Sequence, residues 1–419
     1  MSADKNVPEI RFQGFSGEWL NCSLDQITDV YDGTHQTPAY TKSGVMFLSV
    51  ENIKTLTSKK FISEAAFKDE FSIYPKKNDV LMTRIGDVGT ANVVETDDNK
   101  AYYVTLALLK HKKLSPYFLK SSIASPYVQR DIWLRTLHIA FPKKINMNEI
   151  KQVSVNCPSD TMESDAIGNT FQKLDSLIKQ HQQKHDKLSS IKKAMLEKMF
   201  PKQGETTPEI RFKGFSGKWE EKAFSVCFAN IPNNTLSRAD LNYEAGMAKN
   251  IHYGDVLIKF DEVLDARKEV LPFITSNEVT KKLKHAALRN GDIIIADAAE
   301  DSTVGKCTEL FNVHEQLVFS GLHTIAVRPN LPFASKYLGY YLNSSSYHNQ
   351  LLSLMQGTKV LSISKTAIQN TNVKFPKSDK EQAAIGNYFQ KLDSLINQHH
   401  QQITKLNNIK QACLSKMFV

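Results

Sequence analysis

The sequence predicts an α+β protein in which two unlike globular domains are joined by two long antiparallel coiled-coil helices, as an internal tandem repeat with pseudo-twofold symmetry. Three observations predict this fold. A twelve-residue segment recurs 200 residues later, a 34-residue heptad pattern recurs 218 residues later, and the segments between them are hard to align. With 419 residues, 41% of them apolar, the chain is long enough for several buried cores.

The first repeat opens each half of the chain. It reads PEIRFQGFSGEW at 8–19 and PEIRFKGFSGKW at 208–219, with differences at two of the twelve positions. Because the offsets of the two repeats are 200 and 218, the middle of the second half is longer by 18 residues. The halves therefore begin alike, end alike and differ in between.

The two middles, 20–144 and 220–362, carry signs of mixed α/β or α+β structure. Each contains a short apolar strand that opens on an aspartate, at Asp79–Met82 and at Asp292–Ile295. Each also has a later glycine, Gly89 or Gly305, and a plausible helix before the shared tail, around 116–134 and 333–355. Otherwise the two middles are hard to align.

The second repeat, at 167–200 and 385–418, predicts a long helix in each half. Apolar residues recur at heptad spacing over four to five heptads without proline, which favours a coiled-coil seam. A capping-box signature, Ser378-x-x-Glu381, or its acidic analogue, Asp160-x-x-Glu163, precedes each run. Each helix should be on the order of 50 Å long. The predicted seam residues are Ile167, Phe171, Leu174, Ile178, His181, Leu188 and Met195 in the first helix, and Ile385, Phe389, Leu392, Ile396, His399 and Leu406 in the second.

These patterns divide the chain into five segments. If the helices pack antiparallel, their centres meet near 183 and 401, so we expect His181, His185 and His399 to form a polar layer that fixes the register. The predicted segments are a first globular domain at 1–158, a first helix at 159–200, a linker at 201–207, a second globular domain at 208–376 and a second helix at 377–419.

The formal net charge of +9 raises the expectation of an anionic partner. The helical segments 167–200 and 385–418 carry +4 and +3, so the rest of the chain nets only +2. Lysine-rich coiled coils are common for solubility alone, and that interpretation stays open beside a functional one.

Several classes of protein are disfavoured. Apolar runs fall short of the roughly 18 residues of a membrane span, and the start has no signal-peptide pattern, so a cytoplasmic location is expected. Five cysteines without a CxxC pair indicate neither a disulfide framework nor a zinc ribbon.

The sequence has no P-loop or amino-methyltransferase motif, and the D-x-K match at 98–100 is of a kind that arises by chance. His181 and His185 lack the glutamate of a catalytic zinc helix. We predict no catalytic residue, no metal site and no cofactor in this chain.

The tandem layout, the PEIRFxGFSGxW box and the IGNxFQKLDSLI helix resemble the specificity subunit of bacterial Type I restriction–modification enzymes, over the whole chain. The resemblance implies that 20–144 and 220–362 are target-recognition domains, each reading one half of a split double-stranded DNA site. It also implies docking to two methylation subunits and to motor-nuclease subunits, which would bring S-adenosylmethionine, ATP and magnesium. The first copy departs from the family pattern at Glu163-Ser164, where the second has Glu381-Gln382. A stand-alone two-headed DNA-binding or scaffolding protein is the alternative.

A duplex DNA reader needs Lys and Arg for phosphates, and polar side chains for base edges. The stretch DGTHQTP at 32–38 is similar to one found in many target-recognition domains. For each single residue, ordinary turn chemistry competes with DNA contact. The candidate DNA-binding residues are Thr34, His35, Gln36, Thr37, Lys42, Asn52, Lys54, Lys59, Lys60 and Arg84 in the first domain, and Asn233, Asn234, Arg238, Lys281, Lys282, Lys284, Lys306 and Lys359 in the second.

Overall fold

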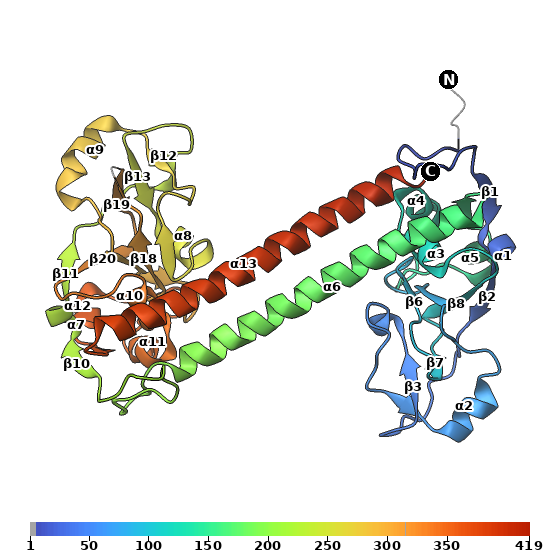
Figure 1. Cartoon of the computed structure of the whole chain (residues 1–419), viewed down its shortest axis with the longest axis horizontal. Coiled ribbons are helices and arrows are strands. Elements are labelled where there is room, and N and C mark those ends of the chain that lie inside the picture. The colour runs from blue at the N-terminus through green and yellow to red at the C-terminus, as the bar shows by residue number, and fades with distance from the viewer. Residues whose placement is uncertain (1–5, 315) are drawn as a thin grey trace. The chain divides into compact units, whose positions relative to one another are not determined.

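The computed structural model describes residues 6–314 and 316–419, and the chain forms two compact units (Figure 1). Unit 1 combines the segment up to Gln182 with His400–Val419, and unit 2 consists of Gln183–His399. Each unit mixes small sheets with short helices, so the predicted α+β class is confirmed. Each unit also contains part of both long helices.

Unit 1 contains three sheets, in the strand orders β2-β8-β5-β6, β4-β3-β7 and β1-β9. Their strands are β1 (Leu20–Ser23), β2 (Thr28–Asp32), β3 (Val45–Leu48), β4 (Phe61–Ile62), β5 (Val80–Thr83), β6 (Ala91–Val93), β7 (Lys100–Tyr102), β8 (Leu106–His111) and β9 (Ser154–Cys157). The short helices are α1 (Leu24–Ile27), η1 (Val50–Asn52), α2 (Glu64–Glu70), α3 (Pro116–Ile123), α4 (Pro126–Arg135) and α5 (Met147–Lys151).

Unit 2 contains four sheets, in the strand orders β11-β20-β16-β18-β14, β12-β15-β13-β19, β10-β22 and β17-β21. Their strands are β10 (Glu220–Ala223), β11 (Phe228–Ile231), β12 (Leu241–Asn242), β13 (Ala248–Ile251), β14 (Val263–Asp265), β15 (Phe273–Ile274), β16 (Ile293–Ala296), β17 (Ala298–Ala299), β18 (Cys307–Phe311), β19 (Leu317–Ser320), β20 (Thr324–Pro329), β21 (Leu361–Ser362) and β22 (Asn372–Phe375). The short helices are α7 (Phe224–Cys227), η2 (Arg238–Asp240), α8 (Tyr253–Ile258), α9 (Asn277–Leu283), η3 (Lys284–Ala286), α10 (Tyr337–Asn343), α11 (Ser345–Leu352) and α12 (Lys365–Gln369).

The two middles that resist alignment share one topology. The order β11-β20-β16-β18 repeats β2-β8-β5-β6, and the parallel pair β13·β19 repeats β3·β7, while β14 is an added edge strand. The aspartates before β5 and β16 also act alike: Asp79 pairs with Lys110 of β8, and Asp292 pairs with Arg328 of β20. The aspartate that opens an apolar strand in each middle therefore marks equivalent positions.

The long helices α6 (Thr161–Lys198) and α13 (Asp379–Lys416) have 38 residues each, about 57 Å at 1.5 Å per residue. In unit 1, Lys410 of α13 pairs with Asp175 of α6 at 2.6 Å. In unit 2 the equivalent residues pair the other way, with Lys192 of α6 at 2.6 Å from Asp393 of α13. The end of each helix thus lies beside the start of the other, so the helices run antiparallel as predicted. Among the described residues, no helix is long and apolar enough to cross a membrane.

The ends of the predicted seam are buried in the domain cores. In unit 1, Ile167 and Phe171 of α6 share a core with Phe418, whose ring centroid lies 5.6 Å from that of Phe171. In unit 2, Ile385 and Phe389 of α13 share a core with Phe200, which stacks on Phe389 at 5.9 Å. Of the remaining predicted seam residues, Leu392 is buried. The others are half-buried, namely Leu174, Ile178, His181, Leu188, Met195, Ile396, His399 and Leu406. The outer turns of each helix therefore anchor a domain, and the polar histidine layer stays a prediction.

The glutamate of each expected capping pattern is bound by the twelve-residue repeat, and at the start of α6 the Asp160 carboxylate also accepts the Met162 N–H at 2.8 Å. Glu163 and Glu381, which are almost fully buried, each receive two hydrogen bonds of 2.6 and 2.7 Å from the guanidinium of Arg11 or Arg211. Because a buried carboxylate needs a charge partner, the arginine takes the role that the N-cap backbone plays in a capping box. The repeat is thereby fixed to the start of a long helix in both units.

A glycine near the start of each long helix lies against a neighbouring helix. A Cβ at Gly168 would lie 2.4 Å from Ser115 Oγ and 2.9 Å from the backbone N of Phe118. Alanine normally favours a helix interior over glycine by about 1 kcal/mol. Here we expect Gly168→Ala to lower the free energy of unfolding by about 1–3 kcal/mol, because the start of α3 must shift.

Urea unfolding of the full chain measures this change. Gly386→Ala is the matched control, because a Cβ there meets its nearest atoms only at 3.2 Å and should cost less. A Gly168→Ala chain as stable as the wild type would contradict the close approach of α6 and α3.

Candidate nucleic-acid interface

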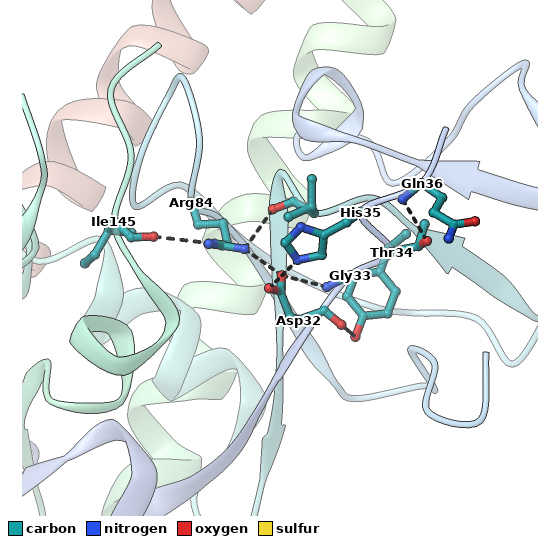
Figure 2. A network of polar contacts seen from close by, with 9 residues as sticks. Asp32, Gly33, Thr34, His35, Gln36, Arg84 and Ile145 are labelled. Atoms are coloured by element: carbon teal, nitrogen blue, oxygen red, sulfur yellow. Dashed lines mark hydrogen bonds and ion pairs between the residues drawn. The ribbon is translucent and has the colours of Figure 1, made fainter. Parts of the chain in front are cut away.

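In unit 1 a polar network forms where β2 and β5 end (Figure 2). The Asp32 carboxylate accepts hydrogen bonds from Arg84 Nη1 at 2.6 Å and from the Gly33 backbone N–H at 2.9 Å. It also lies 3.0 Å from His35 Nε2. One carboxylate therefore connects a buried cation on one side with an exposed imidazole on the other.

Arg84 is enclosed by this network, with a side chain only 8% exposed. Its other contacts are the carbonyl oxygens of Val104 at 3.2 Å and Ile145 at 3.4 Å. Tyr102 donates a hydrogen bond to the backbone oxygen of Asp32, and burial, together with the Asp32 charge, raises the pKa of its phenol. The geometry favours a positioning role for Arg84 over the direct DNA contact predicted from the sequence.

The loop after β2 presents the polar residues predicted from the DGTHQTP stretch. His35, Gln36 and Thr37 are exposed, and Thr34 is half-buried with its hydroxyl accepting a hydrogen bond from the Gln36 N–H at 3.3 Å. Gly33 brings the base of the loop close to a neighbouring segment, since a Cβ there would lie 2.5 Å from backbone atoms of Tyr103. The loop therefore has a fixed base and an exposed polar tip.

The predicted lysines of unit 1 are exposed but do not all gather at this network. Lys42 lies in the loop after β2, whereas Lys54, Lys59 and Lys60 lie between β3 and β4. Lys60 is already paired with Glu51 at 2.9 Å. These lysines suit phosphate contacts better than base reading, because a flexible side chain with a charged ammonium attracts phosphate but does not hold its donors in a fixed direction.

Asn52 has a local structural role. Its side-chain oxygen accepts the Ser49 N–H at 2.9 Å, and its amide nitrogen donates to the carbonyl oxygen of Thr57 at 2.8 Å. Both bonds close the turn around η1. Turn chemistry therefore accounts for this residue without a DNA contact.

Unit 2 forms a second network where β11 and β16 end. Asp297, which follows β16, lies 3.2 Å from Nδ1 of His323, which precedes β20. Asn233, which follows β11, donates to the carbonyl oxygen of Gly321 at 3.4 Å and accepts from Lys365 Nζ at 3.0 Å. Burial raises the pKa of Asp297, and the nearby imidazole of His323 opposes that rise.

The two networks occupy equivalent backbone positions. The carbonyl oxygen of Arg84 accepts the Ile145 N–H at 2.9 Å, and that of Asp297 accepts the Ile363 N–H at 2.8 Å. Asp297 therefore stands where unit 1 has Arg84. The equivalent positions 84 and 297 thus carry side chains of opposite charge in the two units.

Three other residues predicted for unit 2 have structural partners. Arg238 forms two bonds of 2.9 Å to Asp255, and although burial raises the pKa of Asp255, its bonds to Arg238 and Lys259 hold that pKa below its usual range. Asn234 is buried and donates to Asn250. The half-buried ammonium of Lys306 donates to the carbonyl oxygen of Leu257 at 2.9 Å. The exposed members of the predicted set are Arg238, Lys281, Lys282, Lys284 and Lys359.

Asp297, His323 and Lys365 were missed by the sequence reasoning. A signal for Asp297 existed, since it lies five residues after Asp292 as Arg84 lies five residues after Asp79. His323 and Lys365 carried no such signal, because their neighbours in the fold are distant in the chain.

The repeated box forms a second shared surface in both units. Gly14, Ser16 and Gly17 are exposed, as are their counterparts at 214, 216 and 217. The box also meets the end of the other long helix, since the Ile10 N–H donates to the Lys416 oxygen and the Ile210 N–H to the Lys198 oxygen, both at 2.9 Å. A partly exposed sequence is thus repeated almost unchanged, with the same contacts.

Within the described part of the chain, no three His, Cys, Asp or Glu side chains are grouped closely enough to hold a metal ion.

One family model and several solved structures are similar to this chain. Residues 249–408 match the model of the Type I restriction modification DNA specificity domain. A search of curated protein sequences finds no match. The crystal structure of a Type I restriction–modification S subunit from M. genitalium is similar over 99% of both chains, with 16% identity and a TM-score of 0.60. The HsdS subunit from Thermoanaerobacter tengcongensis is matched over 96% of both chains, with 15% identity and a TM-score of 0.41.

Proposed function

We propose that this chain is a DNA specificity protein of the Type I restriction–modification class, and that its two units read the two halves of one split, asymmetric duplex DNA site. Residues 249–408, which match the model of that DNA specificity domain, support this proposal. The observation that carries this proposal is the pair of polar networks. They lie at equivalent sheet edges, and yet one contains Arg84 and the other Asp297. Equivalent placement with unlike chemistry suits two readers of different base sequences.

The exposed loop at His35, Gln36 and Thr37 is the proposed base-reading element of unit 1. Amide and hydroxyl groups at such a tip provide the donors and acceptors that distinguish base edges in the major groove. Asp32 and Arg84 would fix the loop, since their contacts anchor its base. In unit 2 the corresponding group contains Asn233, His323 and Lys365, and the exposed lysines of both units would contact phosphates.

The repeated box and the adjoining helices suit the docking of two copies of one partner. A surface that binds two identical subunits should be nearly the same in both units, and the partly exposed box differs at only two of its twelve positions. We propose that two methylation subunits dock there and that motor-nuclease subunits join them in the cytoplasm. The chain itself would be non-catalytic, and the partners would bind S-adenosylmethionine, ATP and magnesium.

Methylome sequencing of the host with and without this gene tests the proposal. We expect deletion to remove one split, asymmetric adenine-methylation motif completely, and a plasmid copy to restore it. A methylome unchanged by deletion would contradict the specificity role and leave a stand-alone DNA-binding or scaffolding protein.

A further inference from the structure

Unit 1 exposes an apolar loop beside its polar network. The tip loop, residues 136–144, is closed by the backbone pairing of Leu137 with Lys144 and carries Ile139 and Phe141, which are 99% and 104% exposed. Trp133 and Leu134, just before the loop, are 61% and 65% exposed. So many large apolar side chains close together on a surface are typical of a binding site.

The base of the tip loop is attached to the polar network. The Gly86 N–H donates to the Lys143 oxygen at 2.9 Å, and the Ile145 N–H donates to the Arg84 oxygen at 2.9 Å. Figure 2 shows Ile145 directly beside Arg84. The base of the tip loop and the base of the His35 loop are therefore both held by contacts to Arg84.

The charge of the tip loop favours an anionic partner. Lys143 and Lys144 are exposed, and residues 136–144 contain no acidic side chain. Apolar side chains flanked by cations match stacked bases flanked by phosphates.

The sequence of the tip loop differs between the two units, which argues against a repeated protein partner. The equivalent loop of unit 2, residues 354–362, is closed by the pairing of Gln356 with Ser362. It reads LMQGTKVLS, whereas the tip loop reads TLHIAFPKK. A surface for two identical subunits would be alike in both copies, but a surface for unlike half-sites need not be.

We propose that Phe141 and Ile139 insert between neighbouring base pairs of the half-site read by unit 1, and unstack that step. Lys143 and Lys144 neutralise the flanking phosphates. The insertion adds sensitivity to the deformability of the step, because flexible steps are easier to unstack. This inference rests on the proposed function, and it assigns unit 1 a DNA-bending role that the corresponding loop of unit 2 does not share.

The test uses the full chain assembled with its methylation subunits and a duplex that carries the methylated motif, with 2-aminopurine placed at successive positions of each half-site. Binding of the wild type should raise the fluorescence at one step of the half-site read by unit 1. Phe141→Ala should abolish that rise and weaken binding about tenfold or more. The double substitution Lys143→Ala with Lys144→Ala should lower the salt slope of binding by about 2.

Val360→Ala is the matched control, because Val360 is the 56% exposed apolar residue of the equivalent loop in unit 2. It should leave the fluorescence rise intact. Full affinity of Phe141→Ala without any fluorescence rise in the wild type would overturn the insertion while leaving the specificity role standing. Failure of Phe141→Ala to assemble with the methylation subunits would also overturn it, in favour of a protein partner. No specific DNA binding by the wild-type assembly would overturn both proposals.

Discussion

Replacement of residues 20–144 by the corresponding segment of another specificity subunit should change one half of the methylated DNA sequence and leave the other half unchanged. We expect the original sequence of that half-site to disappear completely from the methylated motif. The His35 loop, Asp32, Arg84 and the whole tip loop lie within this segment. The helices that carry the second unit lie outside it.

Both ends of the exchanged segment lie where the fold tolerates a new sequence. The segment begins at β1, which pairs with β9 outside it through backbone hydrogen bonds that depend little on side chains. It ends at Lys144, beside the anchor formed by Ile145 and Arg84. Residues that pack on α6, such as Phe118, must stay apolar in the donor segment.

Methylome sequencing of cells that carry the hybrid measures the outcome. The reciprocal control replaces 220–362 and should change the other half of the motif alone. A hybrid that alters both halves at once would show that the two units do not read DNA independently.

The repeats allowed the sequence to predict the large-scale fold. A segment that recurs nearly unchanged must make the same contacts twice, and the pairs Lys410–Asp175 and Lys192–Asp393 are such contacts. The burial of Phe171 and Phe389 in domain cores was not predictable, because heptad spacing is the same whether a helix packs on a helix or on a domain.

The candidate site was predicted less completely. The exposed polar stretch around His35 was identified because turn residues and base-reading residues share their chemistry. The burial of Arg84 was missed, since an arginine in a sequence does not reveal whether a carboxylate such as Asp32 lies beside it. His323 was missed because its contact with Asp297 joins residues 26 positions apart.

Asp32→Ala should destabilise unit 1 and abolish recognition of its half-site. The substitution leaves the guanidinium of Arg84, which is 8% exposed, without its charge partner. Removal of one member of a buried ion pair costs about 3–5 kcal/mol, and the lower end applies here because the Asp32 side chain is 29% exposed. We therefore expect unit 1 to lose about 3 kcal/mol of stability.

Hydrogen–deuterium exchange of the full chain measures this loss in each unit separately, because peptides from β5 and β16 report on different cores. Methylation of the motif in cells measures recognition. Asp32→Asn should lie between the wild type and the alanine variant, since its side-chain oxygen still accepts a hydrogen bond but carries no charge.

His35→Ala separates a structural role from a reading role. The His35 side chain is 70% exposed, so its loss should change stability by no more than about 0.5 kcal/mol. If the loop reads bases, methylation of the motif should nevertheless fall. Equal losses of methylation for both variants, with stability lost only in Asp32→Ala, would assign reading to the loop and positioning to the ion pair. Full methylation by His35→Ala would move the reading element away from His35.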